Sequence, residues 1–361
     1  MEVKLKIEAV MSVTPLKMTE PRRVRKVVVE EGEGKKSETY GGCYQVVLYY
    51  EKGGKEGEEY GWVMGGWSVE SLARALSEYP LLAGRLQRRE EGEIMGMEIV
   101  SNDSGIRMVE ARVYTSVSDF LQSSQMKDEL EAELVFWKDI DEHTPQYSPL
   151  FYVTNFECGG YSIGISCSLF LAEIVVVENF LKKWAEIHNK ILAGNGDTKT
   201  PIFYHPRLKN PDSPPSNIIS RTPYKNEAQS MLFKITAQDL DFESLAMMCV
   251  EEAEKKLDRT MGSQFSLFVK DSSEVMKVEF WSKDEQRRRR RQEEELGLKS
   301  EMSSTTWDDF GVYEVAFHEG NRPVLVSRWI GSASEGNVVA VPHRENTTTL
   351  SALIIVTPPR P

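Results

Sequence analysis

The chain has 361 residues, 40% of them hydrophobic, which is enough apolar material for a large core and most readily forms two domains. A formal net charge of -12 at pH 7 argues against a general affinity for nucleic acids or anionic lipid surfaces. No run reaches the roughly 18–20 apolar residues of a membrane-spanning helix, so we expect a cytoplasmic protein without a membrane span.

The first part of the chain alternates strand-like and helical patterns. Residues 1–13 alternate charged and apolar side chains, and residues 44–50 (YQVVLYY) are β-branched and aromatic, so both predict strands. A helix is predicted to begin at Ser68, whose hydroxyl would cap it, and to end before Pro80. Its apolar face is formed by Val69, Leu72, Ala73 and Leu76.

The segment 156–188, FECGGYSIGISCSLFLAEIVVVENFLKKWAEIH, predicts a strand, a turn and an amphipathic helix. The strand 161–166 follows the turn at Gly159 and Gly160. The apolar face of the helix consists of Ile174, Val177, Leu181, Trp184, Ile187 or His188, and Ile191. An enzyme often places a catalytic group at such a junction, yet residues 168–170 (Ser, Leu, Phe) contain no strong base at neutral pH.

A proline-rich, polar stretch gives the best domain boundary. We predict a first domain over residues 1–192, a crossover linker over 193–229 and a second domain over 230–361. In the second domain the strand 231–235 precedes a helix with a weak capping signal at Thr236. The remaining predictions are paired strands at 265–269 and 276–280 and four strand-like runs, YEVAF, RPVLVSRWIG, NVVAV and SALIIV.

Several short motifs are rejected as functional sites. The basic run 287–291 lies between acidic residues, so we interpret it as a solvated helix or loop, with a functional basic patch as the alternative. The DFG at 309–311 lacks every other kinase element and is interpreted as a turn. The four cysteines form no CxxC pair, so we expect reduced thiols and no zinc site or disulfide framework. None of the histidines at 143, 188, 205, 318 and 343 is placed against a nucleophile by the local sequence.

Three segments, in this order, resemble the BAHD family of plant acyl-CoA-dependent acyltransferases. They are YPLLAGRL at 79–86, FECGGYSIGIS at 156–166 and W…YEVAF…EG…P…V at 307–324. The resemblance implies an α/β fold of two domains, with mixed sheets flanked by helices and a channel between the domains. It also implies acyl transfer to an alcohol or amine, with acyl-CoA as cosubstrate, no bound cofactor, and a small-molecule acyl acceptor or a protein as partner. We expect a monomer.

The residues that carry the family's chemistry differ in this chain. In the family an HxxxD motif follows the GG strand, and its histidine is the general base. Counting without gaps places the histidine position on Leu169 and the aspartate position on Glu173. The family's DFGWG segment corresponds to AFHEG at 316–320, which keeps only Phe317 and Gly320. The stretch from Glu173 to Ala316 is also shorter than in the family, so we expect a reduced second domain.

Because leucine stands at the position of the motif histidine, we assign no residue as catalytic. Glu173 is expected to be structural or salt-bridged, with a role as base as the alternative, and Cys167 or Ser168 would be nucleophiles only if a base activated them. His318, within the altered segment, is a further weak candidate. Three hypotheses remain: an impaired acyltransferase, a non-catalytic accessory protein of the eceriferum type, and an enzyme recruited to another reaction such as a lyase.

Overall fold

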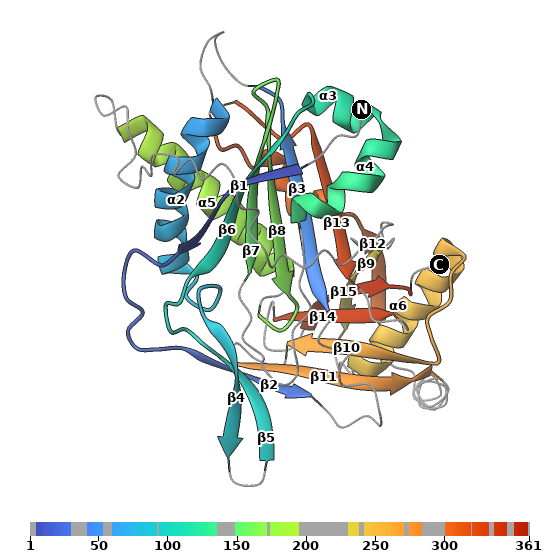
Figure 1. The fold of residues 1–361 in the computed structure, drawn as a ribbon. Coiled ribbons are helices and arrows are strands. Elements are labelled where there is room, and N and C mark those ends of the chain that lie inside the picture. The colour runs from blue at the N-terminus through green and yellow to red at the C-terminus, as the bar shows by residue number, and fades with distance from the viewer. Residues whose placement is uncertain are drawn as a thin grey trace.

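The structure is a computed structural model of the chain. It describes residues 5–29, 42–52, 60–91, 94–135, 149–171, 174–194, 230–237, 242–270, 274–283, 300–318, 320–331, 336–344 and 350–359. Within these ranges the strands form two mixed sheets with helices on their faces, so the predicted α/β class is confirmed (Figure 1).

The first sheet contains six of the described strands. Only β6 and β7 run parallel as neighbours, and the other neighbouring pairs are antiparallel. In spatial order the strands are β1 (Leu5–Val13), β6 (Ile106–Val113), β7 (Leu150–Phe156), β8 (Tyr161–Ser168), β3 (Cys43–Tyr50) and β13 (Leu325–Gly331).

The second sheet contains nine of the described strands, with parallel pairs β10–β14 and β11–β2. In spatial order they are β12 (Ser300–Thr305), β9 (Met231–Ala237), β15 (Leu350–Thr357), β14 (Asn337–Arg344), β10 (Gln264–Lys270), β11 (Val275–Ser282), β2 (Val24–Val29), β5 (Ile94–Val100) and β4 (Arg85–Glu91).

The sheets exchange strands between the two ends of the chain. β13, from the last part of the sequence, pairs with β3 in the first sheet. Conversely β2, β5 and β4, all within the first 100 residues, extend the second sheet beyond β11. One apolar cluster accordingly contains residues of both sheets, among them Val46 and Ile165 from the first and Phe268 and Val278 from the second. The predicted linker lies outside the described residues from 195 to 229.

Helices cover both faces of the first sheet. α2 (Tyr60–Glu78) and α5 (Ile174–Gly194) lie side by side on one face, on the left in Figure 1. The other face is covered by α3 (Val117–Gln122), α4 (Ser124–Leu130) and the 3₁₀ helix η1 (Glu131–Val135). In the second sheet α6 (Phe242–Leu257) packs on β9, β14 and β15. Two short 3₁₀ helices, η2 (Trp307–Phe310) and η3 (Val312–Glu314), precede β13.

A glycine on β8 allows the backbone of η1 to lie directly on the first sheet. A Cβ on Gly164 would be 2.2 Å from the carbonyl oxygen of Leu134, so no other residue fits there without movement. The hydroxyl of Ser166 and the amide nitrogen of Gln45 each donate a hydrogen bond of 2.6 Å to the carbonyl oxygen of Val135. Polar side chains on this face of the sheet therefore donate hydrogen bonds to the Val135 carbonyl, which would otherwise be buried without a donor.

Most of the predicted strands are confirmed, and three local predictions are wrong. α2 begins at Tyr60 rather than Ser68, because the glycine-rich turn before Ser68 has low helix propensity and gave no signal. Thr236 caps no helix; it lies in β9, where it pairs with Glu301 of β12. YEVAF forms no strand: part of it is η3, and the hydroxyl of Tyr50 donates 2.9 Å to the carbonyl of Val315. The basic run 287–291 lies outside the described residues.

Candidate functional site

The junction after β8 forms a packed seam between the two sheets. Leu169 continues the pairing of β8 with β3, its amide donating 3.0 Å to the carbonyl of Gly42. Phe170 lies against Phe268 of β10, with ring centroids 5.8 Å apart. The guanidinium of Arg25 in β2 donates 3.1 Å to the carbonyl of Leu171. Residues 169–171 thus contact strands of both sheets.

Burial limits what these residues can do chemically. The side chains of Leu169, Phe170 and Leu171 are each 1% exposed and belong to the apolar cluster that joins the sheets. Leucine has no lone pair that could accept a proton. Leu169 therefore contributes packing between the sheets, and its side chain offers no group able to deprotonate an alcohol or amine.

The two candidate nucleophiles point to opposite faces of the first sheet, and both are buried. Cys167 is 1% exposed and belongs to the cluster under α2 and α5, with its Sγ 3.6 Å from the carbonyl oxygen of Ser168. Ser168 is 0% exposed, and its Oγ accepts a hydrogen bond of 3.2 Å from the amide of Phe170. A substrate would reach either group only after the seam moved.

The structure does not bring His318 to this junction. The segment around His318 meets the far end of β3, where Phe317 packs edge-on against Tyr50 at 6.2 Å. Leu169 meets the opposite end of β3, beside Gly42. Seven residue steps of extended chain separate these ends, or about 23 Å at ~3.3 Å per residue. Glu173 lies outside the described residues.

The altered AFHEG segment has a structural role. Phe317 is fully buried, and its ring lies edge-on to Trp184 of α5 at 4.7 Å. Asn189 of α5 donates its side-chain amide to the carbonyl of Ala316. Gly320 adopts φ +75°, a left-handed conformation that favours glycine. The two residues that match the family segment are thus the ones used for packing and backbone geometry.

A buried ionic cluster near the start of α5 was not expected from the sequence. Glu178 Oε1 accepts hydrogen bonds from the hydroxyl of Tyr44 at 2.7 Å and from Nε of Arg328 at 3.0 Å. The Arg328 guanidinium lies over the rings of Trp307 and Tyr313, at 5.8 and 5.9 Å from their centroids. The available signal was a carboxylate one turn after Ile174 on the apolar face of α5, because a buried charge needs a partner.

Burial dominates the electrostatics of this cluster. Removal from water raises the pKa of Glu178, and the nearby Arg328 guanidinium opposes that shift without cancelling it. Burial also raises the pKa of Tyr44 well above its ordinary value, with the Glu178 carboxylate adding to the shift. The hydrogen bonds of Glu178 with Tyr44 and Arg328 link α5, β3 and β13 inside the core.

A serine and a histidine meet between α2 and α5. His188 Nδ1 lies 3.0 Å from Ser71 Oγ, and the indole nitrogen of Trp184 donates 2.9 Å to the same oxygen. Ser71 is 0% and His188 1% exposed, so the pair meets no solvent-borne substrate. We interpret it as a polar link between the two helices. No local pattern places residues 71 and 188 together.

The described ranges contain neither a cluster of metal ligands nor a membrane-spanning helix. Among these residues no group of three or more His, Cys, Asp or Glu side chains could hold a metal ion. In the same part of the chain no helix is long and apolar enough to cross a membrane. All four cysteines are free thiols, with Cys158 exposed and the other three buried.

The comparisons with known proteins agree on one family. A family model described as the Transferase family matches residues 69–268. "Hydroxycinnamoyltransferase" of Narcissus pseudonarcissus is 29% identical over 161 residues, which are 43% of this chain and 34% of that protein. "Protein ECERIFERUM 26-like" of Arabidopsis thaliana is 27% identical over 142 residues, 38% of this chain and 32% of that protein. The chain thus spans about a third of the length of these curated relatives. The crystal structure of vinorine synthase aligns with a TM-score of 0.46 and 13% identity, over 98% of this chain and 95% of that one.

Proposed function

Because the chain belongs to the Transferase family of BAHD acyltransferases, we propose that it is a catalytically impaired member that acts by binding. By descent its reaction is transfer of an acyl group from acyl-CoA to an alcohol or amine. The observation that carries the proposal is the burial of Leu169, the residue that our ungapped count assigns to the family's base position: its side chain is 1% exposed and packed in the seam between the sheets.

The size of the lost contribution follows from the role of a general base. A positioned base accelerates proton transfer about 10²- to 10⁴-fold, equivalent to roughly 3–5 kcal/mol of barrier. Leu169 supplies none of this, and His318 joins the opposite end of β3. Binding two substrates side by side would still leave some acceleration from proximity. We therefore expect turnover far below that of an intact family member.

A non-catalytic role fits the way the segment is built. The hydrogen bond from Arg25 to the Leu171 carbonyl and the contact of Phe170 with Phe268 fill the seam with side chains of both sheets. These points support an accessory protein whose partner is a small molecule or another protein.

Thiol release tests the proposal directly. Purified protein is incubated with hydroxycinnamoyl-CoA or acetyl-CoA and a panel of alcohols and amines, and free CoA thiol is followed over time. We expect release close to the background without protein, because only the acceleration from proximity remains. Clear turnover that Glu173→Gln abolishes and His318→Ala leaves intact would contradict the proposal, because it would identify a substitute base.

Restoring the base separates loss of one group from loss of the whole channel. Leu169→His supplies an imidazole, and Leu169→Asn is the matched control that adds polarity without a base. Thiol release with the histidine variant alone would show that both substrates still bind and only the base is absent. With neither variant active, the seam itself has replaced the substrate channel. Urea unfolding of both variants shows whether each one folds.

A further inference from the structure

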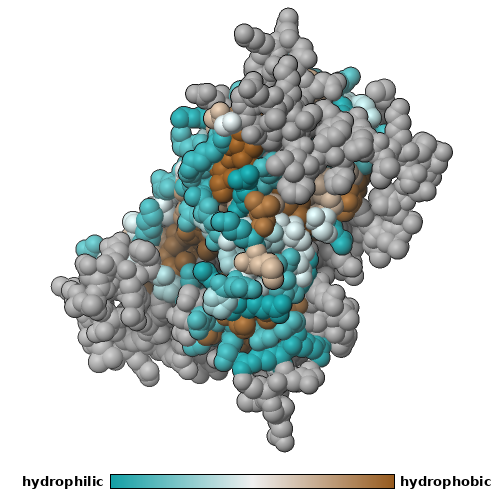
Figure 2. All heavy atoms as spheres, turned by 90° about the vertical axis from the view of Figure 1, so that its left-hand side faces the viewer, coloured by the Kyte–Doolittle hydropathy of each residue, from teal (hydrophilic) through white to brown (hydrophobic). Residues whose placement is uncertain are grey.

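A groove between α2 and α5, on the outer side of the first sheet, has the size and chemistry of a ligand site. Its volume is about 580 Å³, within the range of roughly 300–1,000 Å³ typical of small-molecule pockets. It opens on the side of the molecule that faces the viewer in Figure 2, where brown apolar side chains lie among teal hydrophilic ones. Its lining comes from α2, α5 and the loop after β1.

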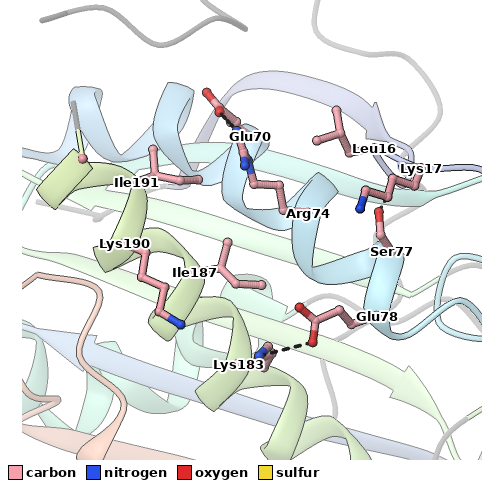
Figure 3. A pocket seen from close by; sticks show the side chains of 11 residues that line it. Leu16, Lys17, Glu70, Arg74, Ser77, Glu78, Lys183, Ile187, Lys190 and Ile191 are labelled. Atoms are coloured by element: carbon pink, nitrogen blue, oxygen red, sulfur yellow. Dashed lines mark hydrogen bonds and ion pairs between the residues drawn. The ribbon is translucent and has the colours of Figure 1, made fainter.

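The loop after β1 is fixed to α2 at two points. The amide of Leu16 donates 2.9 Å to the carbonyl of Ala73. The next amide, that of Lys17, donates 3.1 Å to the hydroxyl of Ser77, one turn further along α2. These bonds hold the Lys17 side chain beside Ser77 at the rim of the groove (Figure 3). The backbone from which the Lys17 side chain extends is thus fixed to α2 before any ligand arrives.

The groove has one cation more than its carboxylates neutralise. Arg74 pairs with Glu70 at 2.8 Å, and Lys183 pairs with Glu78 at 3.3 Å. The remaining lining cations are Lys190, which pairs with Glu186 outside the groove, and Lys17. Within the described part of the chain Lys17 has no carboxylate partner, and only one terminal nitrogen of Arg74 is engaged by Glu70. A local positive surplus in a chain of net charge -12 favours an anion.

The rest of the lining is apolar. Ile187 and Ile191 project from α5 into the space between the helices, and Leu16 lies across from them (Figure 3). Leu16 is 49% exposed, although a leucine gains by being covered. A ligand with a nonpolar body over these three side chains would remove that surface from water.

We propose that this groove binds a small amphipathic anion, a carboxylate or a phosphate monoester attached to a nonpolar body. The anionic group lies on Lys17, and the body covers Ile187 and Ile191. The inference is independent of the proposed function, because the groove lies on the outer faces of α2 and α5 and the seam at Leu169 lies between the sheets.

Isothermal titration with octyl phosphate and with octanoate tests the site. We expect saturable 1:1 binding of one or both anions, weakened as salt screens the contact. Octan-1-ol, which keeps the nonpolar body, and inorganic phosphate, which keeps the charge, are expected to bind at least about tenfold more weakly. Binding of octyl phosphate alone assigns a phosphate ligand, and binding of octanoate alone assigns a carboxylate.

Variants locate the binding in the groove. Lys17→Ala should weaken the anion roughly 3- to 10-fold, because one partly solvated charge contact is lost. Lys17→Arg should retain it, and Lys26→Ala, at an exposed lysine of β2, is the matched control for loss of one positive charge. Equal affinity for octan-1-ol and the anions would overturn the proposal. So would a Lys17→Ala protein indistinguishable from Lys26→Ala. Neither result bears on thiol release at the seam.

Discussion

The contact between Gly164 and η1 makes Gly164→Ala a sharp test of the fold. A Cβ at this position would lie 2.2 Å from the carbonyl oxygen of Leu134 and 2.6 Å from Cγ1 of Val135. Favourable contacts between nonbonded heavy atoms begin near 3.5 Å, so the added methyl group must push η1 away from the sheet by about 1 Å. The nearest atom belongs to the backbone, so no side-chain rotation relieves the clash.

The expected loss of stability has two parts. Overpacking of a close-packed site costs about 1–3 kcal/mol. Lifting η1 also breaks the hydrogen bonds from Ser166 and Gln45 to the Val135 carbonyl, both 2.6 Å long, and each is worth about 1 kcal/mol net. The free energy of unfolding of the Gly164→Ala protein should therefore fall by about 3–5 kcal/mol.

Urea unfolding followed by tryptophan fluorescence measures this loss. With a slope of about 3 kcal/mol per molar urea, the midpoint should fall by about 1 M or more. Gly96→Ala is the matched control, because Gly96 also lies in a strand and a Cβ there would meet nothing within 4 Å. That substitution should change stability by less than about 1 kcal/mol. Equal midpoints for the two variants would refute the packing of η1 on β8.

Three other predictions concern protonation and access. Because burial raises the folded pKa of Glu178 above 4.5, its contribution to stability is present at acid pH and is lost as the pH rises through that folded value. Glu178→Gln, which cannot ionise, should show a smaller fall in urea midpoint between pH 4 and pH 7; an unchanged pH profile would contradict this. Iodoacetamide should label Cys158 in the native protein and reach Cys167 and Cys249 only after unfolding, as mass spectrometry of the labelled peptides would show. The buried tyrosines, whose pKa values are raised, should produce no phenolate absorbance at pH 10, and stability should fall as the pH rises further, since the unfolded chain ionises first; early ionisation would argue against their burial.

Local periodicity was enough to predict the segment from the turn at Gly159 to the end of α5. The apolar pattern changes from a period of two to one of 3.6 across residues 161–191, and the structure has β8 and α5 there. Gly159 lies at φ +84°, which explains the glycine in the turn. The sequence left Ile187 and His188 as alternatives for the inner face. The structure buries His188 and places Ile187 in the outer groove.

Long-range pairing could not be predicted in the same way. β2 is only six residues long and contains two basic residues, Arg25 and Lys26. Its partner β11 is about 250 residues away in the sequence, with Val27 opposite Met276. Pairing between strands so far apart in the sequence leaves no local pattern. The exchange of strands between the two sheets therefore could not be predicted from the sequence. The assignment of the motif histidine position to Leu169 is a prediction that needs only the sequence. The contact of the neighbouring Phe170 with Phe268 depends on the place of β10 in the second sheet, which no local pattern predicts.

The family-like residues that remain in this chain are those the fold needs. Gly160 has no room for a Cβ, which would meet the Tyr50 carbonyl oxygen at 2.7 Å, and Phe317 fills the space beside Trp184. At the positions that the ungapped count assigns to the family's base and second aspartate, Leu169 packs between the sheets and the carbonyl of Ala316 accepts a hydrogen bond from Asn189. Packing constraints persist as long as the protein must fold, whereas constraints on a base persist only while the reaction matters. A family member that works by binding is expected to keep residues that pack and to lose a base, and the thiol-release experiment tests this expectation for Leu169.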